Sequence, residues 1–412
     1  MKIVEVNATY NAGSTGTIMS DIHKLLLSSG FESYVAYSTT DVDENTIVNG
    51  YKIGGVFGKK VHALLSRIGG KQGYYSSFAT RRFIKWLKGI KPDVVHLHNL
   101  HSNYINLNML LDFLAKADIK TVITLHDCWF YTGGCFHYTA VECDKWKKGC
   151  GNCKARNIGT KSYLFDSSQK ILKDRIKYLS AIKDLTVVGV SKWITDEAKL
   201  SGIRAKRFVT VYNGVDTNFF KPQKDTLKEE LGIKDKFVVL GIANKWLKPA
   251  NRELLKEFTS SLKDDMAFVI MGVTERDKAL LPKNVITLPF MNKEKLRRTY
   301  NMADVFANCT REESFSLVNV EAGSSGTPVI TYANTGAKET VSDEFGFKVE
   351  TGNIKEFIDA VFTVYKIGKE KYQDGARQFV IDNFDKDKNY ERFIKLYKGG
   401  DKNNGKYKKN IV

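Results

Sequence analysis

The feature that most constrains the fold is an alternation of short β-rich runs with helix-length segments along nearly the whole chain. Strands separated by helical segments form βαβ units, and successive units build parallel sheets covered by helices. The runs fall into two sets, 3–6, 33–37, 94–98, 121–125, 186–190 and 209–212, and then 237–242, 268–271, 285–288, 305–308 and 329–331. The sequence therefore predicts an α/β protein in which each half forms an open, doubly wound parallel sheet.

The length of the chain also indicates two domains. One hydrophobic core rarely serves 412 residues, so two domains of about 200 residues each are expected. The turn signal Asn213-Gly214 marks the predicted boundary. We predict an N-terminal Rossmann-like domain over 1–215 and a C-terminal Rossmann-like domain over 216–375. A long helix over 376–397 is expected to return to the first domain, and with a basic tail it forms the last region, 376–412.

The excess of positive charge indicates an anionic partner. The formal net charge is +18, which attracts phosphorylated small molecules, an anionic membrane surface or nucleic acid. Because the charge is spread and no nucleic-acid motif is recognisable, nucleic acid is not the expected partner. The segment Lys59–Lys91 mixes basic with large apolar residues, which suits a surface that rests on anionic lipid headgroups. An ordinary amphipathic helix with a charged outer face explains the segment equally well.

The sequence offers no membrane-spanning run and no export signal. No apolar run is long enough to cross a bilayer, and Met1–Val6 reads as a strand rather than as a signal peptide. We therefore expect a cytoplasmic protein, with peripheral attachment to the inner face of the membrane as the further expectation.

Four of the six cysteines fall in one stretch with the spacing Cys-x7-Cys-x6-Cys-x2-Cys, namely Cys135, Cys143, Cys150 and Cys153. In a reducing compartment such a cluster favours metal over disulfides, and four thiolates satisfy a closed tetrahedral zinc site. A structural zinc ion would fix an otherwise irregular loop over 133–155. Unpaired buried thiols are the alternative, because the spacing is not that of a familiar zinc ribbon.

The strongest candidate site is a Glu-x7-Glu stretch formed by Glu313 and Glu321. It follows a predicted strand and opens a predicted helix, whose free N-terminal N–H groups suit a diphosphate. Carboxylates accept two hydrogen bonds from a sugar diol, so the two glutamates could hold hydroxyl groups on either side of that diphosphate. A bare pair at this spacing is more often an ordinary helix surface, so the context decides.

The order of several short motifs supplies that context. The chain contains a glycine loop over 11–16, His126-Asp127, Ser191-Lys192-Trp193, Asn213-Gly214-Val215-Asp216, the Glu-x7-Glu stretch and Gly326-Thr327-Pro328. In this order and spacing the motifs resemble those of the retaining GT-B glycosyltransferases of family 4, also called group 1. The resemblance covers nearly the whole chain and implies two Rossmann-like domains that face a central cleft.

The resemblance also implies an activity. A sugar would pass from a nucleotide-diphosphate donor, a UDP- or GDP-sugar, to a saccharide or lipid-linked saccharide, with retention at the anomeric carbon. No cofactor would be required for catalysis, and surface polysaccharide biosynthesis is the implied process. Two alternatives stay open on the residues alone. An NAD(P)-dependent oxidoreductase would need a full glycine fingerprint, which neither half supplies, and a non-enzymatic nucleic-acid-binding protein would also explain the charge.

The family pattern implies a role for each residue of the Glu-x7-Glu stretch. Glu321 would hold the donor ribose, and Glu313 would act on the transferred sugar as a catalytic residue. The backbone between the two glutamates would meet sugar and phosphate at Ser314, Phe315, Ser316 and Leu317. The two serines replace the glycines usual in the family, and they are expected to narrow the space near the sugar.

The first half has its own implied contacts. Gly13 and Gly16 allow a close backbone approach to the diphosphate at a helix N-terminus, although a plain tight turn is the alternative. His126 would face the reacting sugar and orient the donor or contact the acceptor. His96, His98 and His101 line the acceptor side or belong to the core and rim; their spacing also suits a metal, without an evident fourth ligand.

The cations expected beside the donor phosphates depart from the family pattern. The family places an arginine and then Lys-Gly after the first strand of the second domain, whereas Asn244 stands at the arginine position and no Lys-Gly follows. Negative charge that develops on a leaving diphosphate needs a nearby cation. Lys245 or Lys248 is therefore expected to supply the missing charge.

Overall fold

The computed structural model describes residues 1–156, 158 and 161–400, and it divides into two compact α/β units. Of the described residues, unit 1 comprises Met1–Val211 together with 390–400, and unit 2 comprises Tyr212–Asn389. The observed boundary therefore falls at Val211 and Tyr212 rather than after residue 215. The expected last region, 376–412, is divided between the two units, and its residues 401–412 lie outside the described part.

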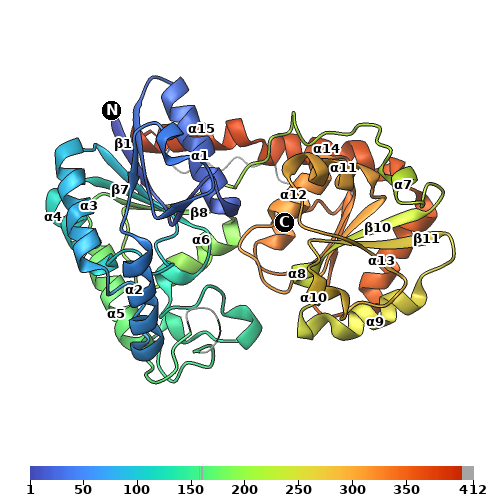
Figure 1. Cartoon of the computed structure of the whole chain (residues 1–412), viewed down its shortest axis with the longest axis horizontal. Coiled ribbons are helices and arrows are strands. Elements are labelled where there is room, and N and C mark those ends of the chain that lie inside the picture. Colours follow the sequence, from blue (N-terminus) through green and yellow to red (C-terminus); the bar gives the residue numbers. More distant parts are fainter. Residues whose placement is uncertain (157, 159–160, 401–412) are drawn as a thin grey trace. The chain divides into compact units, whose positions relative to one another are not determined.

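Unit 1 is built on a seven-stranded parallel sheet (Figure 1). In sheet order its strands are β5 (Gly50–Lys52), β3 (Glu32–Tyr37), β1 (Lys2–Val6), β6 (Val94–Leu97), β7 (Lys120–Leu125), β8 (Leu185–Gly189) and β9 (Arg207–Thr210). Its helices are α1 (Gly13–Ser28), α2 (Val56–Gly69), α3 (Ser77–Ile90), α4 (Leu107–Ala117), α5 (Ser168–Ser180), α6 (Lys192–Lys199) and most of α15 (Lys386–Tyr397). Helix α1 lies on one face of the sheet, and α3, α4 and α5 lie on the other.

Unit 2 repeats this architecture with six parallel strands. In sheet order they are β12 (Val285–Leu288), β11 (Met266–Met271), β10 (Phe237–Ile242), β13 (Val305–Asn308), β14 (Val329–Tyr332) and β15 (Gly346–Val349). The helices are α7 (Leu227–Glu230), α8 (Ala243–Trp246), α9 (Arg252–Ser261), α10 (Glu275–Lys278), α11 (Lys293–Met302), α12 (Leu317–Ser324), α13 (Ile354–Ile367) and α14 (Glu370–Phe384). The core includes the buried aromatic rings of Trp246, Phe258, Phe268 and Phe357.

The prediction of two parallel-sheet α/β domains is confirmed, and each predicted run lies on an observed strand to within a few residues. The sequence analysis missed β5, β15 and the short pair β2 (Thr9–Tyr10) and β4 (Thr39–Thr40). These strands are short or lie at sheet edges, where half-exposed residues give a weak apolar signal.

The expectation of one long helix over 376–397 is wrong. The segment is broken at Asp385, whose backbone is extended (φ −62°, ψ 127°) between α14 and α15. The carboxylate of Asp385 accepts a hydrogen bond from the Thr217 hydroxyl at 2.6 Å, and its backbone forms a parallel bridge with Val215. Gly214 passes so close that a Cβ there would lie 2.2 Å from the Lys386 Cα. The Asn213-Gly214 signal thus reflects a close backbone approach.

Among the described residues, no helix combines the length and the apolar character needed to cross a membrane.

Candidate active site

In both units the direction of strand order reverses at one point in the sheet. The reversal falls between β1 and β6 in unit 1 and between β10 and β13 in unit 2. Loops at the carboxyl ends of such strands diverge and leave a crevice, which is where open α/β sheets bind ligands. The predicted glycine loop and histidines follow β1, β6 and β7, and the predicted lysines and Glu313 follow β10 and β13. The predicted residues of each unit therefore gather beside its own reversal point.

Glu313 and Lys245 approach each other from the two strands that flank the reversal in unit 2. The Lys245 ammonium donates to Glu313 Oε1 at 3.1 Å, and the two side chains are 18% and 23% exposed. The other carboxylate oxygen, Oε2, is buried and has no hydrogen-bond partner among the described residues. A half-buried cation beside a carboxylate with spare acceptor capacity can bind a group that has both negative charge and hydroxyl donors.

The backbone of the Glu313 loop is fixed by hydrogen bonds to Thr335. The Thr335 hydroxyl donates to the Glu313 carbonyl at 2.8 Å, and the Glu313 N–H donates back to the same hydroxyl oxygen at 3.0 Å. The N–H of Gly336 also donates to the Glu313 carbonyl, at 3.0 Å. Thr335 has a left-handed φ of 42°, a strained conformation that tends to be kept where a site requires it. The backbone that presents the first glutamate is therefore held in one position.

Glu321 lies within α12, and its side chain meets the buried side chain of Tyr300 from α11. The Tyr300 hydroxyl donates to Glu321 Oε2 at 2.9 Å. Burial raises the pKa of Glu321 to about 7, and the Tyr300 hydrogen bond and the charge of Lys293 work in the opposite direction. The carboxylate therefore titrates near neutral pH.

The residues between the two glutamates are more enclosed than the sequence suggested. The Phe315 ring packs on Tyr212 and Phe384, with ring centroids 6.0 Å and 5.4 Å away. Ser316 is fully buried and its hydroxyl accepts from Asn308 at 3.1 Å, and its effect on the space near the sugar stays a prediction. Ser314 is buried and its hydroxyl has no partner among the described residues. Leu317 is half-buried and begins α12.

The two cations considered for the diphosphate differ in placement. Lys245 meets Glu313, whereas Lys248 is exposed at the start of a short turn, and Asn244 is exposed on α8. Arg311 is turned away, because its guanidinium donates to Asn251 Oδ1 and to the Ala250 carbonyl, both at 2.9 Å. Among these residues, the structure brings Lys245 to the glutamate stretch.

The glycine loop of unit 1 is explained by packing. Gly13 begins α1 with a left-handed φ of 65°. A Cβ on Gly16 would lie 2.7 Å from Thr9 Oγ1 and 3.2 Å from the Asn11 nitrogen, so α1 can approach β2 only without a side chain here. The plain-turn alternative thus accounts for both glycines, and their assignment to donor binding stays a prediction.

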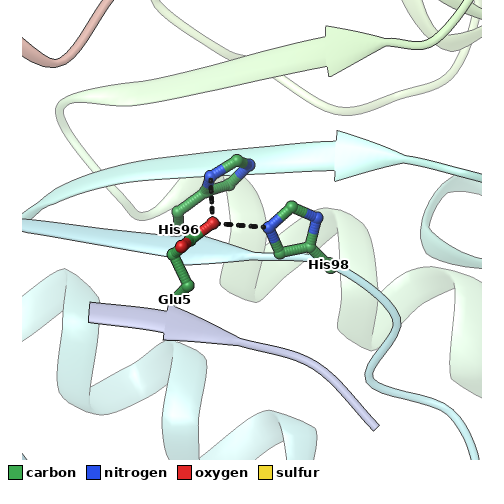
Figure 2. A group of neighbouring side chains, drawn as sticks. All are labelled: Glu5, His96 and His98. Carbon is green, nitrogen blue, oxygen red and sulfur yellow. Dashed lines mark hydrogen bonds and ion pairs between the residues drawn. The ribbon is translucent and has the colours of Figure 1, made fainter. Parts of the chain in front are cut away.

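A buried chain of hydrogen bonds leads to His126. Glu5 Oε1 lies 3.3 Å from His98 Nε2, and His98 Nδ1 lies 3.0 Å from His126 Nε2. Figure 2 shows Glu5 on β1 and the two histidines, His96 and His98, on the neighbouring strand and just beyond it. Glu5 and His98 are fully buried, whereas His126 is half-buried at the end of β7. The chain therefore fixes the ring of a histidine that reaches the surface at a strand end.

Burial shifts the pKa of each of these groups. It raises the pKa of Glu5 well above its ordinary value and lowers the pKa of His126 to about 4. Burial likewise lowers the pKa of His98 well below its ordinary value, and it lowers that of His96 to about 3. Burial thus favours the neutral form of each member of the Glu5–His98–His126 chain. The chain can set which ring nitrogen of His126 has the proton.

Glu5, His96 and His98 also offer ligand atoms within 4.8 Å of one another. Both nitrogens of His96 already have partners, the Tyr397 hydroxyl at 2.6 Å and Thr124 Oγ1 at 2.7 Å. Because the group is fully buried and has just three ligands, a hydrogen-bond network explains it better than a metal does. His101 is separate and pairs with Asp127 Oδ2 at 2.9 Å.

Sequence reasoning missed Glu5, Tyr300 and Thr335. Glu5 had a signal, because an acidic residue inside an apolar parallel strand must find partners in the core. Tyr300 and Thr335 had none, since both meet the glutamates through tertiary contacts across many residues of chain.

The four clustered cysteines come together in the loop between β7 and α5. All four line one cavity, with Tyr138 and Trp146 in its wall. None of them forms a disulfide.

Two parallel-sheet α/β units of this kind are the fold of GT-B transferases, and comparison with known proteins agrees. Residues 16–219 match the family described as Glycosyltransferase Family 4, and residues 223–378 match Glycosyl transferases group 1. The chain is a GT-B glycosyltransferase of family 4. This result decides against the oxidoreductase and nucleic-acid alternatives.

Individual relatives are distant but extend over most of the chain. The glycosyl transferase WcaC of Escherichia coli K12, named for colanic acid biosynthesis, is 24% identical over 87% of this chain and 89% of its own. Sucrose-phosphate synthase of Thermosynechococcus elongatus superposes with a TM-score of 0.69 at 14% identity, covering 97% of this chain and 98% of its own. HepE of Anabaena, solved in complex with UDP, gives 0.67 at 16% identity over 97% of this chain and 100% of its own.

Proposed function

We propose that the protein transfers a sugar from a nucleoside-diphosphate donor to a saccharide or lipid-linked saccharide, with retention at the anomeric carbon, in surface polysaccharide biosynthesis. The supporting observation is the joint placement of Lys245, Glu313 and Glu321 at the reversal point of unit 2. One cation and one carboxylate before the N-terminus of α12, with a second carboxylate within that helix, match the parts of a nucleotide sugar, a diphosphate between two polyols.

Each of these residues would have a separate role in sugar transfer. Glu321 accepts hydrogen bonds from the ribose diol, and the N-terminus of α12 faces the diphosphate. Lys245 stabilises the negative charge that develops on the leaving diphosphate, and Glu313 holds hydroxyl groups of the transferred sugar. His126, fixed by the chain from Glu5, orients the sugar or contacts the acceptor. In this reading no catalytic metal takes part.

Two comparisons support the substrate classes. HepE was solved with UDP and with UDP-glucose, which favours a UDP-sugar as donor. WcaC is named for the biosynthesis of a surface polysaccharide, which favours an acceptor of that kind. Retention rests on the resemblance of the Glu-x7-Glu stretch to the motif of the retaining enzymes.

The donor is tested by thermal shift against UDP, GDP, ADP, their common sugar conjugates, NAD and NADP. We expect one nucleoside diphosphate to raise the Tm of the native protein and of the control Glu253→Ala, which changes an exposed residue of α9. Glu321→Ala should abolish that shift. Stabilisation by NAD or NADP alone would contradict the proposal. With the donor known, the anomeric configuration of the product is read by NMR, and an inverted product would refute retention.

We further propose that α2 rests on an anionic membrane at the inner face of the bilayer. Its outer side exposes large apolar side chains, with Phe57 81% and Leu64 58% exposed. Lys59, Lys60 and Arg67 lie on the same helix, so apolar contact and attraction to anionic headgroups act together.

Vesicle flotation tests this surface. The protein should float with phosphatidylglycerol vesicles at low salt and should not float with phosphatidylcholine vesicles. A double variant, Phe57→Ser with Leu64→Ser, should lose most of the binding, whereas Leu280→Ser, which changes an exposed apolar residue of unit 2, should keep it. If both variants bind the vesicles equally well, α2 is not the membrane-binding surface.

A further inference from the structure

The connection between β7 and α5 is long for a compact domain. It runs from 126 to 167 and contains short 3-10 turns, Trp129–Tyr131, Thr139–Val141 and Lys145–Lys147, but no strand or α-helix among its described residues. A long segment without regular structure loses much conformational entropy when it is ordered, so it usually needs additional fixation. The first part is fixed by Arg175, which donates to the Thr132 carbonyl at 2.7 Å. The part beyond Thr132 depends on other contacts.

The cysteines lie in that second part and converge. Cys135, Cys143, Cys150 and Cys153 line a single cavity, and the thiols of Cys135 and Cys153 are hydrogen-bonded to each other. The remaining two cysteines, Cys128 and Cys309, are buried elsewhere and do not line it. Four sulfur atoms that line one cavity, from separate stretches of the loop, have the chemistry of the ligand set of a closed zinc site, although no three of them lie within 4.8 Å of one another among the described residues.

The surroundings supply what a cluster of thiolates requires. The N–H groups of Gly133 and Ala155 donate to the sulfurs of Cys150 and Cys153. A Cβ on Gly133 would lie 2.9 Å from the Cys150 sulfur, so the glycine permits this approach. Lys145 holds the turn between Cys150 and Cys153 through the Gly151 and Asn152 carbonyls, at 3.1 Å and 3.2 Å. Backbone donors and a cation near the sulfurs stabilise the excess negative charge of four thiolates on a divalent ion.

We propose that these four cysteines bind one structural zinc ion, which fixes the connection between β7 and α5. The site is closed, because four thiolates fill a tetrahedral coordination shell and leave no position for substrate or water. The ion therefore orders the loop that follows His126-Asp127 and takes no part in sugar transfer. Each cysteine releases its proton on binding, so zinc is lost at low pH.

Metal content of the full-length protein tests the site. Protein made in zinc-supplemented medium and dialysed against metal-free buffer should contain one zinc ion per chain, as measured by inductively coupled plasma mass spectrometry. Cys150→Ser and Cys143→Ser should lose most of it, whereas Cys128→Ser and Cys309→Ser, the matched controls outside the cavity, should keep it. Hydrogen exchange should rise within 133–155 on zinc removal and stay unchanged in unit 2.

Cobalt replacement keeps the test decisive if a serine variant fails to fold. The native protein reconstituted with Co²⁺ should show the strong thiolate-to-cobalt charge-transfer bands of a four-sulfur tetrahedral site. The proposal would be overturned if the purified chain contained no metal, or if it contained iron and sulfide in place of zinc. It would also be overturned if the intact mass were lower by two hydrogen atoms per cysteine pair, which indicates disulfides. Zinc that persists unchanged in Cys143→Ser and Cys150→Ser would also refute this ligand set.

Discussion

The two units place different chemistry at the same point of the same fold. At its reversal point unit 1 gathers groups whose burial favours the neutral form, namely the histidines and buried Glu5. Unit 2 instead gathers the ion pair of Lys245 with Glu313 and a carboxyl group, Glu321, whose pKa lies near 7. All seven histidines of the chain lie in unit 1. A doubly wound sheet provides a crevice at the strand ends, and the side chains in the loops decide what the crevice can do.

The largest expected difference between the units is their response to acid. In unit 1 burial lowers the pKa of His23, His62 and His126 to about 4 and that of His96 to about 3. Between these values and the unfolded pKa near 6.5, the unfolded chain binds more protons, so stability falls as the pH falls. At pH 5 each histidine should cost unit 1 about 2 kcal/mol relative to pH 8.

In unit 2, Glu321 makes a contribution to the pH dependence of stability that has the opposite sign. Its folded pKa of about 7 lies above its unfolded value, so the folded state binds the extra proton and the stability from this group rises as the pH falls from 7 toward 4. Hydrogen exchange of the whole protein at pH 8 and pH 5, corrected for intrinsic rates, should show lower protection in unit 1 and little loss in unit 2. Equal loss in both units would contradict the comparison.

The next largest effect is expected from the same conservative change made once in each unit. Glu313→Gln removes the negative charge that meets Lys245 and that, by the proposed function, binds the transferred sugar, so kcat should fall by about 10²–10³-fold. The fold should be unaffected, because the backbone contacts of Glu313 with Thr335 remain. Steady-state assays with the donor that the thermal-shift screen identifies measure kcat, and an unchanged kcat would show that Glu313 is not a catalytic residue.

Glu5→Gln is the matched change in unit 1 and should be nearly silent. Burial raises the pKa of Glu5 and favours its protonated form, and the amide of glutamine can replace a neutral acid beside His98. Glu5→Leu, in contrast, leaves the His98 nitrogen without a partner and should destabilise the protein by about 1–3 kcal/mol. Chemical denaturation of both variants measures the difference. If Glu5→Gln is as destabilising as Glu5→Leu, Glu5 is an anion in the folded protein.

The smallest effect concerns the pH dependence of donor binding. By the proposed function Glu321 accepts donor hydroxyl groups as a carboxylate, so donor affinity should fall about tenfold for each pH unit below its pKa of about 7. Tyr300→Phe removes a hydrogen bond that lowers this pKa, and the midpoint should therefore move to higher pH. Calorimetry with UDP between pH 6 and pH 8 measures the shift. A flat profile in the native protein would show that Glu321 does not titrate in this range.

The sequence predicted the fold well because the apolar runs of buried parallel strands are continuous and strong. Ile3, Val4 and Val6 are fully buried in β1, and such residues identify a strand with both faces covered. Edge strands such as β15 were missed since half-exposed residues lack that signal. The break at Asp385 was missed because it depends on Thr217 and Val215, far away in the chain.

The candidate site divides in the same way. By itself the sequence determined which residue types follow each strand, and with the motif order this was enough to select Glu313, Glu321, Lys245 and His126. Only the tertiary structure decided their partners, since Tyr300, Thr335 and Glu5 reach them across the sheet and between helices. Partners set burial and hydrogen bonding, and these set whether a carboxyl or an imidazole is charged. The order of residues along a chain does not contain that information until the chain is folded.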